Sequence, residues 1–96
     1  MAHYFITGAS SGIGKALSIA LASEGHVVSA VGRRIEHLKK IKSKHKNINI
    51  FRADVCDRLE IKNAIERSIK SGGNIDCAVL NAGKYLPLGG PELNSE

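Results

Sequence analysis

Three glycines in one short stretch constrain this chain more than any other feature of its sequence. The stretch TGASSGIGKA, residues 7–16, follows a short apolar run and contains Gly8, Gly12 and Gly14. A turn with so few side chains lets the backbone come close to a phosphate. A helix that starts there adds unpaired N–H groups and the positive end of its dipole. A tight turn without any ligand would need glycines as well. The surrounding segments must therefore show whether this turn binds a phosphate.

Around this stretch, strand-like and helix-like segments alternate. Short apolar or β-branched runs predict strands at residues 3–7, 26–31, 48–53 and 75–83. Amphipathic patterns predict helices at residues 11–25, 34–45 and 57–71. This order, β-α-β-α-β-α-β, predicts an α/β fold, a partial Rossmann fold with a parallel sheet of about four strands and helices on both faces. The glycines then lie between the first strand and the first helix, where such a sheet binds a pyrophosphate, and this favours a ligand over a bare turn.

Several details of these elements can be predicted. Gly25 is suited to end the first helix, and Asp57 to cap the start of the third. The apolar positions expected to face the core are Ile13, Leu17, Ala20 and Leu21 in the first helix, Ile35, Leu38 and Ile41 in the second, and Leu59, Ile61, Ile65 and Ile69 in the third. The two cysteines, Cys56 and Cys77, are too few for a disulfide framework and lack zinc-binding spacing, so each is expected to be a small buried side chain.

The chain has 96 residues, enough for one small domain, which we expect to span residues 1–84. Residues 85–96 contain both prolines, two adjacent glycines and no periodic pattern. They are predicted to form a loop or a tail.

The excess of positive charge has a simple structural explanation. Lys and Arg outnumber Asp and Glu by 14 to 9, and much of the excess lies in residues 33–46, where apolar residues keep helical spacing. A basic outer face on an amphipathic helix accounts for this pattern. No aromatic residues alternate with the cations, so we expect no nucleic-acid partner. The start of the chain has neither a basic region nor a long apolar stretch, so we expect no membrane partner and a cytoplasmic location.

A nucleotide-binding P-loop can be excluded. That motif reads G-x-x-x-x-G-K-[ST]. Gly14 and Lys15 supply its GK pair, but Ala9 stands at the first glycine position and Ala16 at that of the hydroxyl residue. The residue that would hold magnesium is therefore missing.

The glycine stretch matches a narrower motif than the general dinucleotide-binding pattern. It reads T-G-x-x-x-G-x-G, and three further segments end the later predicted strands: VGRR at 31–34, ADV at 53–55 and LNAG at 80–83. In these four motifs, taken in order, the chain resembles the short-chain dehydrogenase/reductase family over residues 2–88. One departure is Leu80, where the family usually has asparagine. The resemblance implies an oxidoreductase that interconverts a carbonyl and an alcohol, with its strands in the order third, second, first, fourth.

The resemblance also implies which residues would bind the cofactor. The pyrophosphate turn would be lined by Gly8, Gly12, Ile13 and Gly14, with Ser10 and Ser11 near the phosphates and the adenosine ribose. The adenine would meet the Asp54 side chain and the Val55 backbone, and the ribose would lie beside Asn81, Ala82 and Gly83. Two of these residues have alternative roles: Asp54 as a strand-end cap and Asn81 as a residue that steadies the sheet.

The residue at the end of the second predicted strand selects between NAD and NADP. A carboxylate there binds the two ribose hydroxyls of NAD and repels a 2′-phosphate. This chain has Gly32 at that place, followed by Arg33 and Arg34, and a guanidinium group can bind a phosphate with two hydrogen bonds. The pattern predicts NADP as the cofactor. The alternative is that both arginines are simply solvated at the start of a helix, where a cation gains nothing from the helix dipole.

The tyrosine and lysine of the family's catalytic motif, Y-x-x-x-K, are not found in these 96 residues. The two tyrosines, Tyr4 and Tyr85, are each followed four residues later by a glycine. No catalytic residue and no metal ligand is therefore predicted. We expect the chain to be the cofactor-binding N-terminal part of such an enzyme, inactive alone. The alternative is a non-enzymatic NADP(H)-binding module or a regulatory fragment.

The fourth predicted strand would lie at an edge of this sheet. Its apolar CAVL segment would then have unpaired backbone groups and no later helix to cover it. We expect the chain to associate with itself through this strand.

Overall fold

The computed structural model describes residues 1–10 and 12–81, and within them four strands and three helices alternate in the predicted order. The elements are β1 (His3–Thr7), α1 (Gly12–Ser23), β2 (Val27–Gly32), α2 (Ile35–Lys44), β3 (Ile48–Arg52), α3 (Arg58–Gly72) and β4 (Cys77–Val79). The predicted tail at 85–96 lies outside the described residues, as do Ser11, Ala82 and Gly83.

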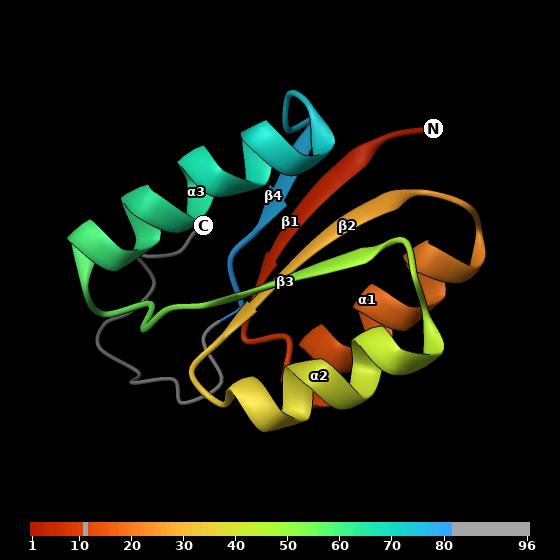
Figure 1. Cartoon of the computed structure of the whole chain (residues 1–96), viewed down its shortest axis with the longest axis horizontal. Coiled ribbons are helices and arrows are strands. Elements are labelled where there is room, and N and C mark those ends of the chain that lie inside the picture. The colour runs from red at the N-terminus through yellow and green to blue at the C-terminus, as the bar shows by residue number, and fades with distance from the viewer. Residues whose placement is uncertain (11, 82–96) are drawn as a thin grey trace, which may run out of the picture.

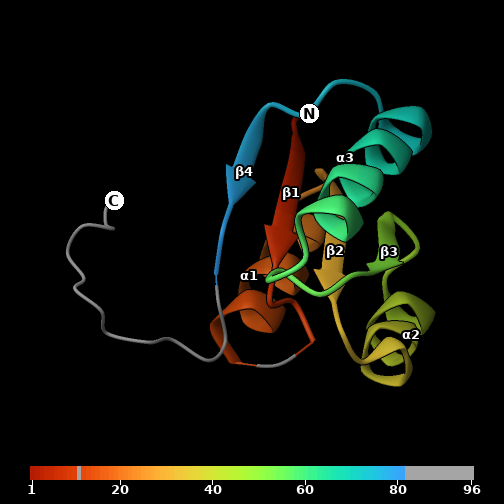
Figure 2. The ribbon, with the colours of Figure 1, turned by 90° about the vertical axis from the view of Figure 1, so that its left-hand side faces the viewer.

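The four strands form one parallel sheet in the order β3-β2-β1-β4. Within it, Phe5 of β1 is level with Ser29 of β2 on one side and with Ala78 of β4 on the other. Helices α1 and α2 lie on one face of the sheet and α3 on the other (Figure 1). Figure 2 shows β4 at one edge of the sheet, next to β1. The predicted fold class is confirmed, and so is the strand order that the family resemblance implied.

Alternate residues of β1 supply the two halves of the core. Ile6 packs in one cluster with Leu38 and Ile41 of α2, whereas Phe5 packs in a second cluster with Ala64 of α3. Successive side chains of a strand point to opposite faces of the sheet, so one strand serves both helical layers. Because both faces are covered, β1 is buried along almost its whole length.

The predicted helix caps are confirmed. Asp57 precedes α3, and its Oδ1 accepts hydrogen bonds from Leu59 N at 3.0 Å and from Glu60 N at 3.2 Å. Gly25 follows α1 with a φ of +91°, and the backbone N–H groups of Gly25 and His26 donate to the carbonyls of Ala22 and Leu21. This pair of bonds is the Schellman arrangement, in which glycine readily adopts the left-handed conformation.

The predicted buried faces are correct for α2 and only partly correct for the other two helices. α1 buries Gly14, Ser18 and Ala22, while Ile13 is 76% exposed and Ala20 is also exposed. α3 buries Ala64 and Ser68, while Leu59 is 66% exposed and Ile69 is 40% exposed. Small residues face the sheet in both helices and let the helix backbone come close to it. The larger Leu17, Leu21, Ile61 and Ile65 pack only partly buried beside that line of small residues.

The edge of the sheet differs from the sequence prediction in two respects. Among the described residues β4 covers Cys77–Val79, fewer than the predicted 75–83, of which 82 and 83 lie outside the described part of the chain. Both cysteines are exposed, so the prediction that they are buried was wrong. Cys56 lies in the loop between β3 and α3, and Cys77 lies on the edge strand.

Candidate dinucleotide-binding site

The predicted site residues that the structure describes lie at one edge of the sheet. Gly8 and Ser10 follow β1, Arg33 follows β2, Asp54 follows β3, and Asn81 follows β4. Because the strands are parallel, all of these positions are at the carboxyl ends of the strands, where open α/β sheets bind their ligands. Figure 1 shows this edge, with the turns that leave β1, β2 and β3 lying near one another.

Hydrogen bonds hold the ends of neighbouring strands together at this edge. Ala9 N donates to Val31 O and Ala53 N donates to Gly32 O, both at 3.0 Å. These two bonds link the turn after β1 to β2, and the turn after β3 to β2. At these two points the edge is therefore held by the backbone alone.

Thr7 makes the corresponding link to β4. Its buried hydroxyl accepts a hydrogen bond from Asn81 N at 2.8 Å and lies 3.4 Å from Asn81 O, to which it donates. The sequence analysis used Thr7 only as a letter of the glycine motif and missed this role. The one available signal was a hydroxyl residue at the last position of an otherwise apolar strand.

Two of the three motif glycines are explained by packing within the protein. Gly8 has a φ of +63°, and a Cβ atom there would collide with the carbonyl oxygen of Asn81. A Cβ atom at Gly14 would collide with the carbonyl oxygen of Gly8 and would lie 3.0 Å from Nδ2 of Asn81. The glycine turn, the start of α1 and the end of β4 thus touch through their backbones and the Asn81 amide. These contacts fit the structural role proposed for Asn81 as the alternative to ribose binding.

Gly12 is different. Its φ is +61°, and no described atom lies within 4 Å of where its Cβ would be. The backbone conformation favours glycine, but the space beside it is not filled by the described part of the protein. Gly12 begins α1, whose first turn offers backbone N–H groups and a positive dipole end. Ile13 follows it in the same turn and is largely exposed.

The end of β2 presents two free cations. Gly32 is buried, whereas Arg33 and Arg34 are exposed. The two ion pairs within residues 1–10 and 12–81 join His26 to Glu24 and Arg52 to Glu60, so neither arginine takes part in one. Arg34 stands at the N-cap of α2 without a side-chain capping bond. Both guanidinium groups are therefore available for an anion.

After β3, Asp54 has the structural role proposed as its alternative. Its Oδ1 accepts a hydrogen bond from Cys56 N at 2.9 Å and so stabilises the turn into α3. Asp54 N donates to Glu60 Oε1 at 2.8 Å, a contact that the sequence analysis missed. The next residue, Val55, is 43% exposed and stands at the same edge.

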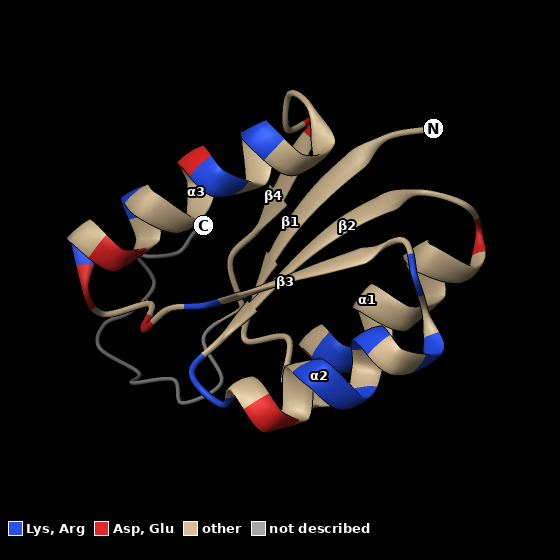
Figure 3. Ribbon diagram, in the orientation of Figure 1, with Lys and Arg blue, Asp and Glu red and all other residues tan. Residues whose placement is uncertain are grey.

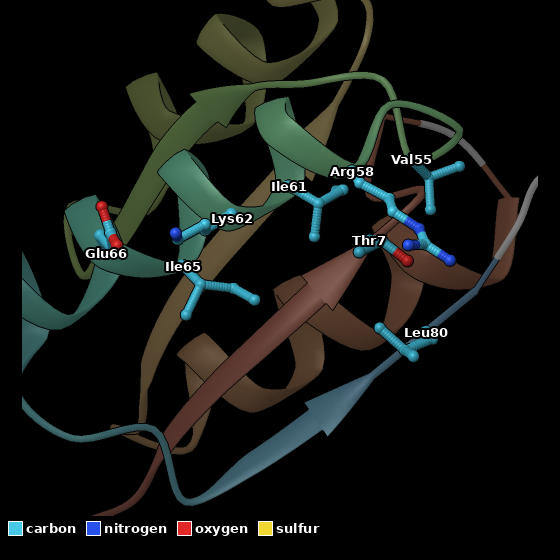
Figure 4. A pocket seen from close by; sticks show the side chains of 8 residues that line it. All are labelled: Thr7, Val55, Arg58, Ile61, Lys62, Ile65, Glu66 and Leu80. Atoms are coloured by element: carbon cyan, nitrogen blue, oxygen red, sulfur yellow. The ribbon is translucent and has the colours of Figure 1, made fainter.

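An open apolar groove of about 450 Å³ begins at this edge and runs between α3 and β4 (Figure 4). Its apolar wall is formed by Ile61 and Ile65 of α3 together with Val55 and Leu80, and Thr7 lies at its base. The charged side chains of α3 that line it are Arg58, Lys62 and Glu66. The groove is on the face of the sheet opposite to α1 and α2.

Both α2 and α3 carry several lysine and arginine residues (Figure 3). On α2 they stand beside a single acidic residue, Glu36. Lys39, Lys40 and Lys44 are exposed there, as the amphipathic pattern predicted. In the described part of the chain there is no group of three His, Cys, Asp or Glu side chains that could hold a metal ion. Nor is any helix of residues 1–10 and 12–81 long and apolar enough to cross a bilayer.

Comparisons with known proteins agree with this fold. The family model for short chain dehydrogenases matches residues 2–95. An uncharacterised oxidoreductase of Listeria monocytogenes is 40% identical over 82 residues, which cover 81% of this chain and 33% of that protein. The chain thus spans about a third of the length of the curated relatives it matches.

Solved structures give the same result. A short chain dehydrogenase/reductase family oxidoreductase from Aeromonas hydrophila superposes with a TM-score of 0.84 at 28% identity, over 97% of this chain and 45% of that one. Actinorhodin polyketide ketoreductase with NADPH superposes with a TM-score of 0.81 at 28% identity, over 86% of this chain and 33% of that one. With its parallel sheet, its glycine turn and a family match over almost its whole length, the chain belongs to the short-chain dehydrogenase family.

Proposed function

We propose that this chain is the NADP(H)-binding N-terminal part of a short-chain dehydrogenase that interconverts a carbonyl and an alcohol. The observation that carries the proposal is the exposed pair Arg33 and Arg34, which has no ion-pair partner in the described residues and follows the buried Gly32. The pair stands at the same sheet edge as Gly12, whose neighbouring space is unfilled by described atoms.

The chemistry of this edge fits a dinucleotide with a 2′-phosphate. The first turn of α1 offers donors to the pyrophosphate, and the absence of a side chain at Gly12 lets the phosphates approach the backbone. The guanidinium groups would bind the 2′-phosphate, which a carboxylate at the end of β2 would repel. The relative bound to NADPH is consistent with this cofactor.

The bound cofactor would supply the hydride, and the residues of this chain would hold its adenosine half. Thr7 and Asn81 keep the ends of β1 and β4 together beneath it. Val55 offers an exposed apolar side chain at the place proposed for the adenine. The 96 residues contain no Y-x-x-x-K pair, so we propose that the chain alone has no dehydrogenase activity.

A titration tests the cofactor proposal. The purified chain is titrated with NADPH and NADH by calorimetry, beside the variant Arg33→Ala/Arg34→Ala. We expect NADPH to bind more tightly than NADH, and the variant to lose about 10- to 100-fold in NADPH affinity, since each tenfold loss is about 1.4 kcal/mol of binding energy. Its NADH affinity should stay unchanged, because NADH lacks the phosphate.

A matched control separates a specific contact from a general charge effect. The variant Lys39→Ala/Lys40→Ala removes two exposed cations from the middle of α2 and should leave both affinities unchanged. Equal losses in the two double variants would contradict a site at the arginine pair. Equal binding of NADH and NADPH by the wild-type chain would contradict NADP preference.

A second candidate function is a non-enzymatic NADP(H)-binding module or regulatory fragment. Both candidate functions rest on the same motifs. They differ in whether the chain is part of an enzyme or binds the cofactor without catalysis. A dehydrogenase assay of the chain mixed with a full-length relative distinguishes them. A change in the rate that exceeds the depletion of free NADPH would support the regulatory fragment.

We also propose that the chain associates with itself through β4. Cys77 and Ala78 are exposed on this edge strand, and the apolar groove lies beside it. Sedimentation velocity should detect dimers or larger species that Ala78→Lys converts to monomers, because a lysine on an edge strand opposes pairing. The control Ala20→Lys adds the same charge on an exposed position of α1. A wild-type chain that stays monomeric at high concentration would contradict this proposal.

A further inference from the structure

The glycine turn and the end of β2 meet at one pair of residues, Ser10 and Gly32. A Cβ atom at Gly32 would lie 3.2 Å from Ser10 Oγ, 3.3 Å from Ser10 Cβ and 3.5 Å from Ser10 N. The first two distances are shorter than an ordinary van der Waals contact. The Ser10 side chain therefore covers the face of Gly32 from which a side chain would leave.

The backbone of Gly32 does not itself require glycine. Gly8, Gly12, Gly25 and Gly73 have positive φ angles, and Gly32 is not among them. Any residue could adopt its conformation, so only the space above it opposes a side chain. Ser10 fills that space.

The two residues are also held in position. Ala9, which precedes Ser10, is fully buried and donates from its N–H to Val31 O at 3.0 Å. Gly32 O accepts from Ala53 N at 3.0 Å. A side chain at Gly32 thus cannot gain room by a free shift of either backbone, and the Ser10 side chain would have to move.

We propose that Ser10 is a specificity-determining residue, which keeps the end of β2 closed to a carboxylate and so helps to set the preference for NADP over NAD. This inference rests on the proposed function. Two features would then favour NADP over NAD: the cations at 33 and 34, and the contact between Ser10 and Gly32. An acid placed at 32 would repel the 2′-phosphate, but Ser10 would hold its carboxylate away from the position that binds the ribose hydroxyls of NAD.

The decisive experiment compares Gly32→Asp with Ser10→Gly/Gly32→Asp in binding to NADPH and NADH. We expect Gly32→Asp to weaken NADPH binding by about tenfold or more, as a like-charge contact does, with less than a twofold gain for NADH. The double variant should bind NADH about tenfold more tightly than Gly32→Asp does. Ser10→Gly is chosen over Ser10→Ala because Ser10 Cβ itself is close to the built atom.

A second readout needs no cofactor. Thermal unfolding is measured for the wild-type chain, Gly32→Ala, Ser10→Gly and the pair Ser10→Gly/Gly32→Ala. Gly32→Ala should lower Tm in the presence of Ser10 and change it little in the presence of glycine at 10. Such non-additivity is the signature of two residues in contact. Additive changes in Tm would overturn the inference.

The outcomes separate the inference from the proposed function. If the wild-type chain binds NADPH and Gly32→Asp gains NADH as strongly as the double variant, the inference fails while the proposed function stands. If the wild-type chain binds neither dinucleotide, the proposed function fails for the isolated chain, and the unfolding measurements alone decide whether Ser10 closes the space at 32. The control Ala20→Asp adds a carboxylate on an exposed position of α1 and should change neither affinity by more than about twofold, because it lies away from the site.

Discussion

The two ends of the sheet differ in how their polar side chains are used. At the amino ends of the strands, polar side chains join backbone groups in linking the elements. The buried ring of His3 lies 2.6 Å from Ser29 Oγ through Nε2 and 2.9 Å from Gly73 O through Nδ1. It joins β1 to β2 and to the end of α3.

Asn47 and Asp76 work in the same way at this end. Asn47 Nδ2 donates to Ala22 O and to His26 O, both at 2.8 Å, and so joins the turn before β3 to the end of α1. Asp76 accepts from His3 N through Oδ2 at 2.8 Å, and its own N–H donates to His3 O at 2.9 Å. Polar side chains at this end are occupied by the protein itself.

At the carboxyl ends of the strands, backbone bonds and the side chains of Thr7 and Asp54 make the links. Ala9 N and Ala53 N donate to strand carbonyls of β2, and glycines let the turns touch directly. Arg33 and Arg34 remain exposed and take part in neither of the ion pairs found among the described residues. The comparison teaches that His3, Asn47 and Asp76 at one end are engaged by the protein, whereas the two arginines at the other end are left available for a ligand.

The largest effect is expected from Gly14→Ala. In an open helix position this change would stabilise the protein by about 1 kcal/mol. Here the new Cβ would collide with the carbonyl oxygen of Gly8, so we expect a loss of about 3 kcal/mol in the free energy of unfolding. Urea denaturation measures it. A stabilised variant would show that the backbone contact at the carboxyl end is unimportant.

His3→Ala tests the opposite end. The change removes a buried ring and leaves Gly73 O and the Ser29 hydroxyl without that partner, for an expected loss of about 2–3 kcal/mol. The preference for NADPH over NADH should be unchanged, because the ring lies at the far end of β1. Denaturation and a dinucleotide titration of the same sample check both parts. A changed preference for NADPH over NADH would show that the amino ends of the strands also affect cofactor binding.

Gly12→Ala should separate binding from packing within the glycine turn. No described atom opposes the new Cβ, so the expected cost to stability is only the strain of its positive φ, about 1–2 kcal/mol. NADPH affinity should fall more than for other substitutions with a similar cost in stability, because the methyl group would stand where the phosphates approach. Normal NADPH affinity in a folded Gly12→Ala variant would argue against a phosphate at this turn.

The smallest effect is expected from Asp57→Ala, which removes a side-chain link at the carboxyl end. Leu59 N and Glu60 N lose their capping oxygen, and N-cap changes of this kind cost about 1 kcal/mol. The bond is exposed, so water replaces part of it. A melting experiment measures the loss, and Asp57→Asn, which keeps a capping oxygen, should recover most of it. A loss as large as that of His3→Ala would contradict the contrast between the two ends.

Much of the fold could be predicted because its signals are local. Apolar runs and helical spacing predicted the seven elements, and Asp57 and Gly25 predicted two helix ends within two residues. The helix faces were less certain, since spacing alone does not tell whether a large or a small side chain meets the sheet. Ile13 fits the apolar pattern and yet is exposed. It is Gly14, not Ile13, through which the start of α1 packs against Gly8.

The site could be predicted as a set of residues but not as an arrangement. The four motifs follow the four strands, and parallel strands bring them to one edge. The link between Thr7 and Asn81 joins residues 74 positions apart, and no local pattern predicts it. No local pattern predicts the contact between Ser10 and Gly32 either. The cofactor roles of all the predicted site residues and the cytoplasmic location stay predictions.

The sequence by itself determined the order of strands and helices, the parallel sheet that this order requires, and the positions of glycines and arginines after the strands. These depend on neighbours along the chain and on the handedness of the connections. Only the tertiary structure decided that Gly8 and Gly14 serve packing, that no other described segment fills the space beside Gly12, and that Ser10 lies close against Gly32. Such contacts depend on how closely distant segments approach one another, and differences of less than an ångström decide whether a side chain fits.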